Sequence, residues 1–267
     1  MKAFLKTAIW IIGILGGIYV IICAYLYSEQ EALIFPGTKL PKAYAYSFQT
    51  QFKEYSIKTS DGDTLSACLF KTTKPRGLVF YLHGNGGNIS SWGSVAEHYT
   101  SLGYDLFMVD YPGYGKSSGH IKSLPQLLDA IDAAYAFIKP NYSENHIVIL
   151  GYSIGSGLAA WLASKNHPQK LLLLAPYYSL NDLVSKRDPY LPAIILKYRI
   201  NTYQYIQHTR NPIIIFHGDH DEEIYYGSSL KLKRHLKSGD KLITLHGQGH
   251  NGIDDNPDYL DSLKSLL

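Results

Sequence analysis

The chain has 267 residues, a length that allows one α/β domain with a large buried core. Its 25 Lys and Arg residues nearly balance 22 Asp and Glu residues, and no long run of like charge occurs. A nucleic-acid-binding protein would gather basic residues on one face, so the composition argues against nucleic acid as a partner.

An uncharged, apolar segment lies near the N-terminus, at Ala8–Tyr27. As a helix it would be roughly 30 Å long, enough to cross the hydrocarbon core of a bilayer. Lys2 and Lys6 precede it, and basic flanks stay in the cytoplasm. We therefore expect residues 1–28 to form a short cytoplasmic stub and one transmembrane anchor. The rest of a single-pass membrane protein would then be extracytoplasmic, in the periplasm, a lumen or outside the cell.

Two alternatives remain for this segment. The first is a cleaved signal peptide, but the segment is longer than the 7–15 apolar residues of a usual one, and no clear small-x-small cleavage site follows it. The other alternative is a helix buried in a soluble core.

Residues 29–48 carry two prolines and no clear hydrophobic period, so they are predicted to be a linker to a domain at 49–267. In that domain, apolar runs alternate with amphipathic segments. Strands are expected at 53–59, 64–71, 77–82, 105–110, 146–150, 170–175, 212–217 and 241–246. Helices are expected at 88–102, 123–138, 153–166, 227–237 and 257–267.

This alternation predicts the α/β class, with a mostly parallel sheet of about eight strands and helices on both faces. One interval breaks the rhythm, at about 176–211. It is rich in tyrosine, leucine and isoleucine and carries three prolines. A connection this long between buried strands is usually a cap or a binding loop.

The stretch Gly151-Tyr152-Ser153-Ile154-Gly155 lies between a predicted buried strand and a predicted helix. By itself Gly-x-Ser-x-Gly is a weak motif, and a tight turn with an idle serine is its alternative reading. Its position, however, is where a nucleophile elbow is built, with Ser153 on a strained turn. The first helical amides, beginning with Ile154, would then point to developing negative charge.

A serine hydroxyl needs a base, and the base needs a carboxylate to orient it. Asp219 and Asp221 follow the predicted strand at 212–217, and His250 follows the last predicted strand. Carboxyl ends of parallel strands meet at one sheet edge, so these residues are expected near Ser153. The order Ser…Asp…His thus predicts a catalytic triad, with a surface-loop role as the alternative for His250.

The loop after the third strand, His-Gly-Asn-Gly-Gly-Asn at 83–88, is poor in bulky side chains. We expect the backbone amide of Asn85 to complete an oxyanion hole with that of Ile154. Gly115-Lys116-Ser117 echoes the end of a P-loop, but Asp110 stands where its first glycine belongs. A metal site is also not indicated, because ordinary metal-ligand spacing is missing from the group His217, Asp219, His220 and Asp221. No metal or cofactor is therefore expected.

Together, the motifs at 83–88, 110–119, 151–157, 175–184, 217–224 and 247–251 resemble the α/β-hydrolase superfamily. More narrowly, they are similar to membrane-anchored serine hydrolases of the monoacylglycerol-lipase and protein-depalmitoylase type. In that family the acid lies three residues before an aliphatic position, which favours Asp221, before Ile224, over Asp219. The family's histidine corresponds to His250.

The resemblance implies a serine hydrolase that cleaves esters or thioesters by acyl transfer. The apolar, tyrosine-rich cap favours an acyl or lipid-like substrate, and the N-terminal helix would hold the enzyme at a membrane. Two alternatives stay open: a serine peptidase or amidase using the same triad, and a non-catalytic membrane-anchored scaffold.

Overall fold

The computed structural model describes residues 1–267 and contains one eight-stranded sheet, in the order β1-β2-β4-β3-β5-β6-β7-β8. β1 and β2 pair antiparallel, as do β2 and β4, and all other pairs are parallel. The predicted α/β sheet is therefore confirmed. The strands are β1 (Phe52–Lys58), β2 (Thr64–Phe70), β3 (Gly77–Leu82), β4 (Tyr104–Val109), β5 (Ile147–Tyr152), β6 (Lys170–Leu174), β7 (Ile213–Gly218) and β8 (Lys241–Leu245).

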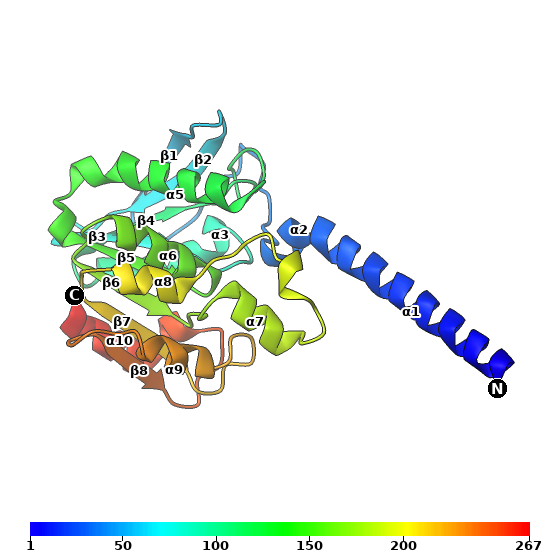
Figure 1. The fold of residues 1–267 in the computed structure, drawn as a ribbon. Helices are drawn as coiled ribbons and strands as arrows, with labels where there is room; N and C mark the ends of the chain where they lie inside the picture. The colour runs from blue at the N-terminus through cyan, green and yellow to red at the C-terminus, as the bar shows by residue number, and fades with distance from the viewer.

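Helices cover both faces of the sheet (Figure 1). They are α1 (Lys2–Ser28), α2 (Gln30–Ile34), α3 (Ile89–Trp92), α4 (Ala96–Thr100), α5 (Leu124–Ile138), α6 (Ile154–Lys165), α7 (Leu180–Arg187), α8 (Thr202–His208), α9 (Gly227–Lys233) and α10 (Pro257–Leu266).

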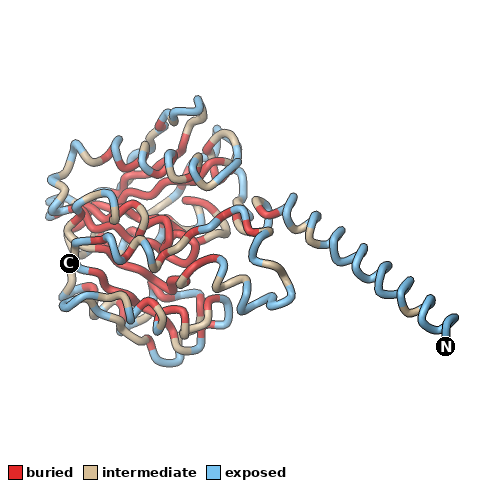
Figure 2. The backbone as a smooth tube through the Cα atoms, viewed as in Figure 1, coloured by how far each residue is buried: buried red, intermediate tan, exposed pale blue.

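The central strands are buried along their length (Figure 2). Their side chains alternate between two cores, one on each face of the sheet. In β3, Leu78, Phe80 and Leu82 face the core under α5 and α6. Val79 and Tyr81 face the core under α4 and α10. Two-sided burial explains why these strands are continuously apolar in the sequence.

The helix expected at 88–102 is broken into α3, a 3₁₀ turn at Gly93–Val95, and α4. Asn88 caps α3 by accepting a hydrogen bond from the Ser90 amide. A Cβ on Gly93 would lie 2.5 Å from the Phe48 ring. The ring of Phe48, from a distant segment, thus packs against the backbone where α3 ends, a contact that periodicity along the sequence does not show.

The cap interval contains α7, a 3₁₀ turn at Ala193–Ile195, and α8, which packs on α6. Residues 29–48, predicted to be a linker, contain α2 and make specific contacts with the domain. Helix α1 is the one helix long and apolar enough to cross a membrane, and none of its residues is buried (Figure 2). It extends away from the domain beside α2 (Figure 1).

Candidate active site

Ser153 occupies a sharp turn between β5 and α6, with φ 53° and ψ −119°. A positive φ is uncommon for a residue with a Cβ and stores strain, which persists only where surrounding structure enforces it. Here the Ser153 amide donates to the carbonyl of Leu174 at 2.9 Å, anchoring the turn to β6. Such an enforced conformation is the one that a nucleophile elbow places on its serine.

The flanking glycines are required by close packing. A Cβ on Gly155 would lie 2.1 Å from the carbonyl oxygen of Leu82, and one on Gly151 would lie 2.3 Å from that of Gly155. Both distances are below any real Cβ contact, so only glycine fits. The Gly-x-Ser-x-Gly pattern therefore reflects α6 pressing against β3.

His250 lies beside Ser153, in the loop after β8. Its Nε2 is 3.0 Å from Ser153 Oγ, and its Nδ1 is 2.8 Å from Asp221 Oδ2. The carboxylate is an acceptor, so it assigns the proton to Nδ1 and leaves Nε2 free to accept from the hydroxyl. The structure thus brings the three predicted side chains together in the arrangement that acyl transfer needs.

Asp221 is held by more than His250. Its Oδ1 accepts hydrogen bonds from the Ile224 amide at 2.8 Å and the Glu223 amide at 2.9 Å, and His217 Nε2 lies 3.1 Å from Oδ2. Burial alone would raise the pKa of Asp221, but these hydrogen bonds, with those of His250, outweigh it. They hold the pKa of this carboxyl well below its usual range, so it is ionised at neutral pH.

His217 is a supporting residue that the sequence did not indicate. Its Nδ1 is 2.6 Å from Ser229 Oγ, and its Nε2 lies 2.8 Å from the carbonyl of Ile224. Nε2 therefore carries a proton shared between that carbonyl and Asp221. His217 is fully buried and holds the loop that carries Asp221 in place. This role depends on α9, which carries Ser229.

Asp219, the alternative acid, points elsewhere. Its carboxylate accepts from His246 Nδ1 at 2.8 Å and from the Gly247 amide at 2.7 Å, near the surface. It joins the loops after β7 and β8 and makes no contact with His250. The geometry favours Asp221 as the acid.

The two predicted oxyanion donors, Asn85 and Ile154, line one cavity together with Ser153. Ile154 is the first residue of α6, so its amide has no acceptor within the helix. Asn85 follows β3, and Tyr114 Oη donates to its carbonyl at 2.8 Å. Trp92 Nε1 likewise donates to the carbonyl of Gly86, also at 2.8 Å. These two hydrogen bonds hold the loop that carries Asn85 in place.

Two cavities meet at Ser153. The first, of about 410 Å³, is mostly apolar and lies under the cap. The second, of about 440 Å³, is mostly polar and contains His250. Asn85 and Glu223 line both. A serine between an apolar and a polar cavity suits an acyl group on one side and a polar leaving group on the other.

The polar cavity is acidic. The Glu223 carboxylate lies 3.7 Å from His250 Nε2 and is half-exposed. Asp254 is buried and accepts from Tyr81 Oη at 2.8 Å and Tyr99 Oη at 3.1 Å. Burial raises the pKa of Asp254 to about 6, although those hydrogen bonds oppose the shift. No motif in the sequence indicates that Asp254 lies at the site.

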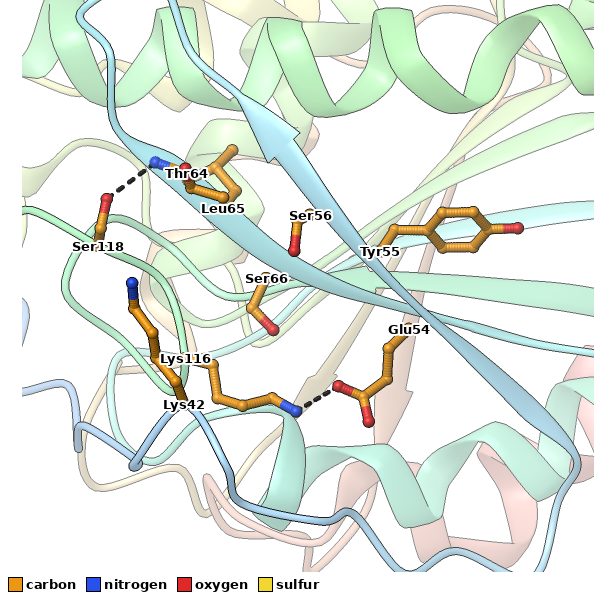
Figure 3. Close-up of a pocket in the computed structure, with 9 residues that line it drawn as sticks. All are labelled: Lys42, Glu54, Tyr55, Ser56, Thr64, Leu65, Ser66, Lys116 and Ser118. Atoms are coloured by element: carbon orange, nitrogen blue, oxygen red, sulfur yellow. Dashed lines mark hydrogen bonds and ion pairs between the residues drawn. The ribbon is translucent and has the colours of Figure 1, made fainter.

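A third cavity, of about 260 Å³, lies beside β1 and β2 (Figure 3). Lys116 reaches across it to form an ion pair with Glu54. The neighbouring Ser117 Oγ accepts from the Ser66 amide and donates to the carbonyl of Asp110, both at 2.8 Å. Gly115-Lys116-Ser117 thus braces the loop after β4, and this cavity contains no nucleophile–base pair.

Comparison with known proteins shows related chains. The family described as "Serine aminopeptidase, S33" matches residues 73–207. Protein bem46 of Schizosaccharomyces pombe is 27% identical over 214 residues, covering 74% of this chain and 72% of that protein. Alpha/beta hydrolase domain-containing protein 17B of Xenopus tropicalis is 28% identical over 224 residues, covering 80% of this chain and 74% of that protein.

Solved structures share the fold. An α/β hydrolase from Vibrio vulnificus aligns with a TM-score of 0.68 at 20% identity, covering 81% of each chain. An esterase from Pyrococcus furiosus aligns with a TM-score of 0.66 at 18% identity, covering 87% of this chain and 96% of that one. The predicted α/β-hydrolase fold is therefore confirmed.

Proposed function

Since this chain belongs to the α/β-hydrolase family described as serine aminopeptidase, S33, we propose that it is a serine hydrolase of carboxylic ester or thioester bonds in acyl or lipid-like substrates. The observation that carries the proposal is the hydrogen-bonded series Ser153–His250–Asp221. Ser153 occupies a strained turn and lines two cavities.

In the first half-reaction, Ser153 Oγ attacks the acyl carbonyl while His250 Nε2 takes the hydroxyl proton. The amides of Asn85 and Ile154 stabilise the oxyanion that forms. His250 then gives its proton to the leaving alcohol or thiol as the bond to the acyl carbon breaks. Asp221 orients His250 and stabilises its charged form.

In the second half-reaction, water attacks the acyl-enzyme and His250 takes one of its protons. The acid is released and the proton returns to Ser153 Oγ, which restores the enzyme.

We expect a fluorophosphonate probe to label the detergent-solubilised wild type and to label neither Ser153→Ala nor His250→Ala. The probe forms a covalent bond only with a serine whose hydroxyl is activated by a base. Gel fluorescence checks this result, with near-UV circular dichroism to establish that each variant is folded. An unlabelled but folded wild type would reject the hydrolase proposal and favour a non-catalytic scaffold.

A second candidate, an aminopeptidase, rests on Glu223. Its carboxylate lies 3.7 Å from His250 Nε2 and lines both cavities, so it offers a negative charge to the ammonium group of a peptide N-terminus. This function predicts that the wild type cleaves an aminoacyl anilide and that Glu223→Gln loses at least tenfold in kcat/KM on it. On the ester proposal, the wild type cleaves the ester with the same acyl group and leaves the anilide uncleaved.

We further propose that α1 anchors the enzyme in a membrane, with residues 1–6 in the cytoplasm. Its length and apolar composition support an anchor, and Lys2 and Lys6 support the orientation. Protection of the catalytic domain from protease added on the cytoplasmic side of sealed membranes tests this orientation, and its digestion there would reverse it.

A further inference from the structure

The apolar cavity at Ser153 is not formed by the catalytic domain alone. Leu26, at the end of α1, and Gln30, Leu33 and Ile34 of α2 line it together with residues of the cap. Its volume of about 410 Å³ lies in the range of ordinary small-ligand sites. The segment that leaves the membrane anchor is therefore one wall of the cavity that begins at the serine.

This wall is fixed to the cap by specific contacts. Gln30 is buried, and its side chain pairs with the cap backbone: Nε2 donates to the carbonyl of Ile195 at 2.6 Å, and Oε1 accepts from the Lys197 amide at 2.8 Å. Tyr198 Oη donates to Glu31 at 3.0 Å. A buried amide with both ends satisfied holds α2 in one position.

The residues after α2 contact the opposite side of the site. The Thr38 amide donates to the carbonyl of Gly87 at 3.3 Å, and Asn88 Nδ2 donates to the carbonyl of Thr38 at 2.9 Å. Both partners belong to the loop that carries Asn85. The juxtamembrane segment thus connects the cap to the predicted oxyanion loop.

The cap tip lies alongside the anchor. Tyr19 Oη donates to the carbonyl of Tyr190 at 2.6 Å. Tyr19 lies nine residues before Ser28, the last residue of α1, which is roughly 14 Å along the helix. Tyr190 and the nearby Ile194 are 85% and 78% exposed, apolar surface that a bilayer would cover.

A second contact between the cap and the anchor lies near the end of α1. Lys197 Nζ lies 4.5 Å from the centre of the Tyr27 ring, near the end of α1. Tyrosine and lysine are the residues that anchor a helix at the headgroup level. With this pair at the boundary, Tyr190 lies at the depth of the acyl chains and the cavity is at the level of the interface.

We propose that the end of α1 and helix α2 form one wall of the acyl site, so that the long acyl chain of an ester embedded in the leaflet passes along this wall to Ser153. This inference rests on the proposed ester hydrolysis and specifies where the substrate enters. The anchor is then a part of the substrate site as well as a tether.

The test uses the full chain in phosphatidylcholine vesicles. We expect Leu26→Trp and Leu33→Trp, which fill the cavity from this wall, to lower the ratio of kcat/KM for 4-nitrophenyl palmitate over 4-nitrophenyl butyrate at least tenfold. Leu15→Trp is the matched control, because Leu15 is exposed on the same helix and does not line the cavity. Leu15→Trp should leave the ratio unchanged. Leu33→Met keeps the wall apolar and flexible, so its ratio should stay close to that of the wild type.

A ratio within twofold of the wild type in both Leu26→Trp and Leu33→Trp, with fluorophosphonate labelling showing that the variants are folded, would overturn the inference and leave ester hydrolysis standing. An equal fall in Leu15→Trp would also overturn it, because the effect would then come from the anchor in general. Absence of butyrate hydrolysis and of labelling in the wild type would instead reject the proposed function.

Discussion

Asp221→Asn is expected to lower kcat for a soluble short-chain ester about 10⁴-fold, the size of effect that loss of the orienting acid has in serine hydrolases. The asparagine amide would present a donor to His250 Nδ1, which now donates to Asp221 Oδ2 at 2.8 Å. His250 would turn or change its tautomer, and Nε2 would no longer accept the proton of Ser153. Steady-state hydrolysis in detergent measures the loss.

Asp219→Asn is the matched control, since it makes the same chemical change two residues away in the same loop. Its carboxylate serves His246 and Gly247, so we expect kcat to stay within about twofold of the wild type. The assignment would be wrong if Asp219→Asn caused the large loss and Asp221→Asn the small one.

Asp221→Asn should also change how the free energy of unfolding depends on pH. The pKa of Asp221 in the folded chain lies below its ordinary value. Its ionised form therefore stabilises the fold above about pH 4, and this stabilisation is lost as the pH falls towards the folded-state pKa. Asp221→Asn should thus lose less unfolding free energy than the wild type between about pH 6 and about pH 3.

Gly155→Ala is expected to lower the free energy of unfolding by about 3 kcal/mol, at the upper end of overpacking effects in a close-packed interior. The added methyl group would lie 2.1 Å from the carbonyl oxygen of Leu82 and 2.7 Å from that of His83. Neither neighbour is a flexible side chain, so α6 must move away from β3. Ser153 moves with α6, and activity should fall as well.

Gly86→Ala provides the control for this second prediction. Gly86 lies in the loop after β3, has no heavy atom within 4 Å of an added Cβ, and has no positive φ. Its stability should stay within about 0.5 kcal/mol of the wild type. Denaturant unfolding in detergent, followed by near-UV circular dichroism, compares the two. Equal free energies of unfolding for Gly155→Ala and Gly86→Ala would show that α6 is not closely packed on β3.

Several features of the molecule follow from local sequence. Strands β5 and β6 are continuously apolar because helices cover both sides, and that pattern predicts a parallel sheet without further information. Ser153, Asp221 and His250 each follow a strand in the sequence. Parallel strands bring their carboxyl ends to one edge of the sheet, so the three residues are expected to meet there. The apolar length of α1 likewise belongs to one continuous segment.

Short-range patterns in the sequence are therefore sufficient to predict the strands, most helices, the turn at Ser153 and the apolar N-terminal helix. The tertiary structure alone shows which aspartate contacts His250, that His217 contacts Asp221, where the helix expected at 88–102 breaks, and that Gln30 packs against the cap. Each of these depends on a contact between residues distant in the chain, such as the 165 positions between Gln30 and Ile195. Hydrogen bonds and steric overlap act only at contact distance, so no pattern within one segment reveals which distant residue will supply them.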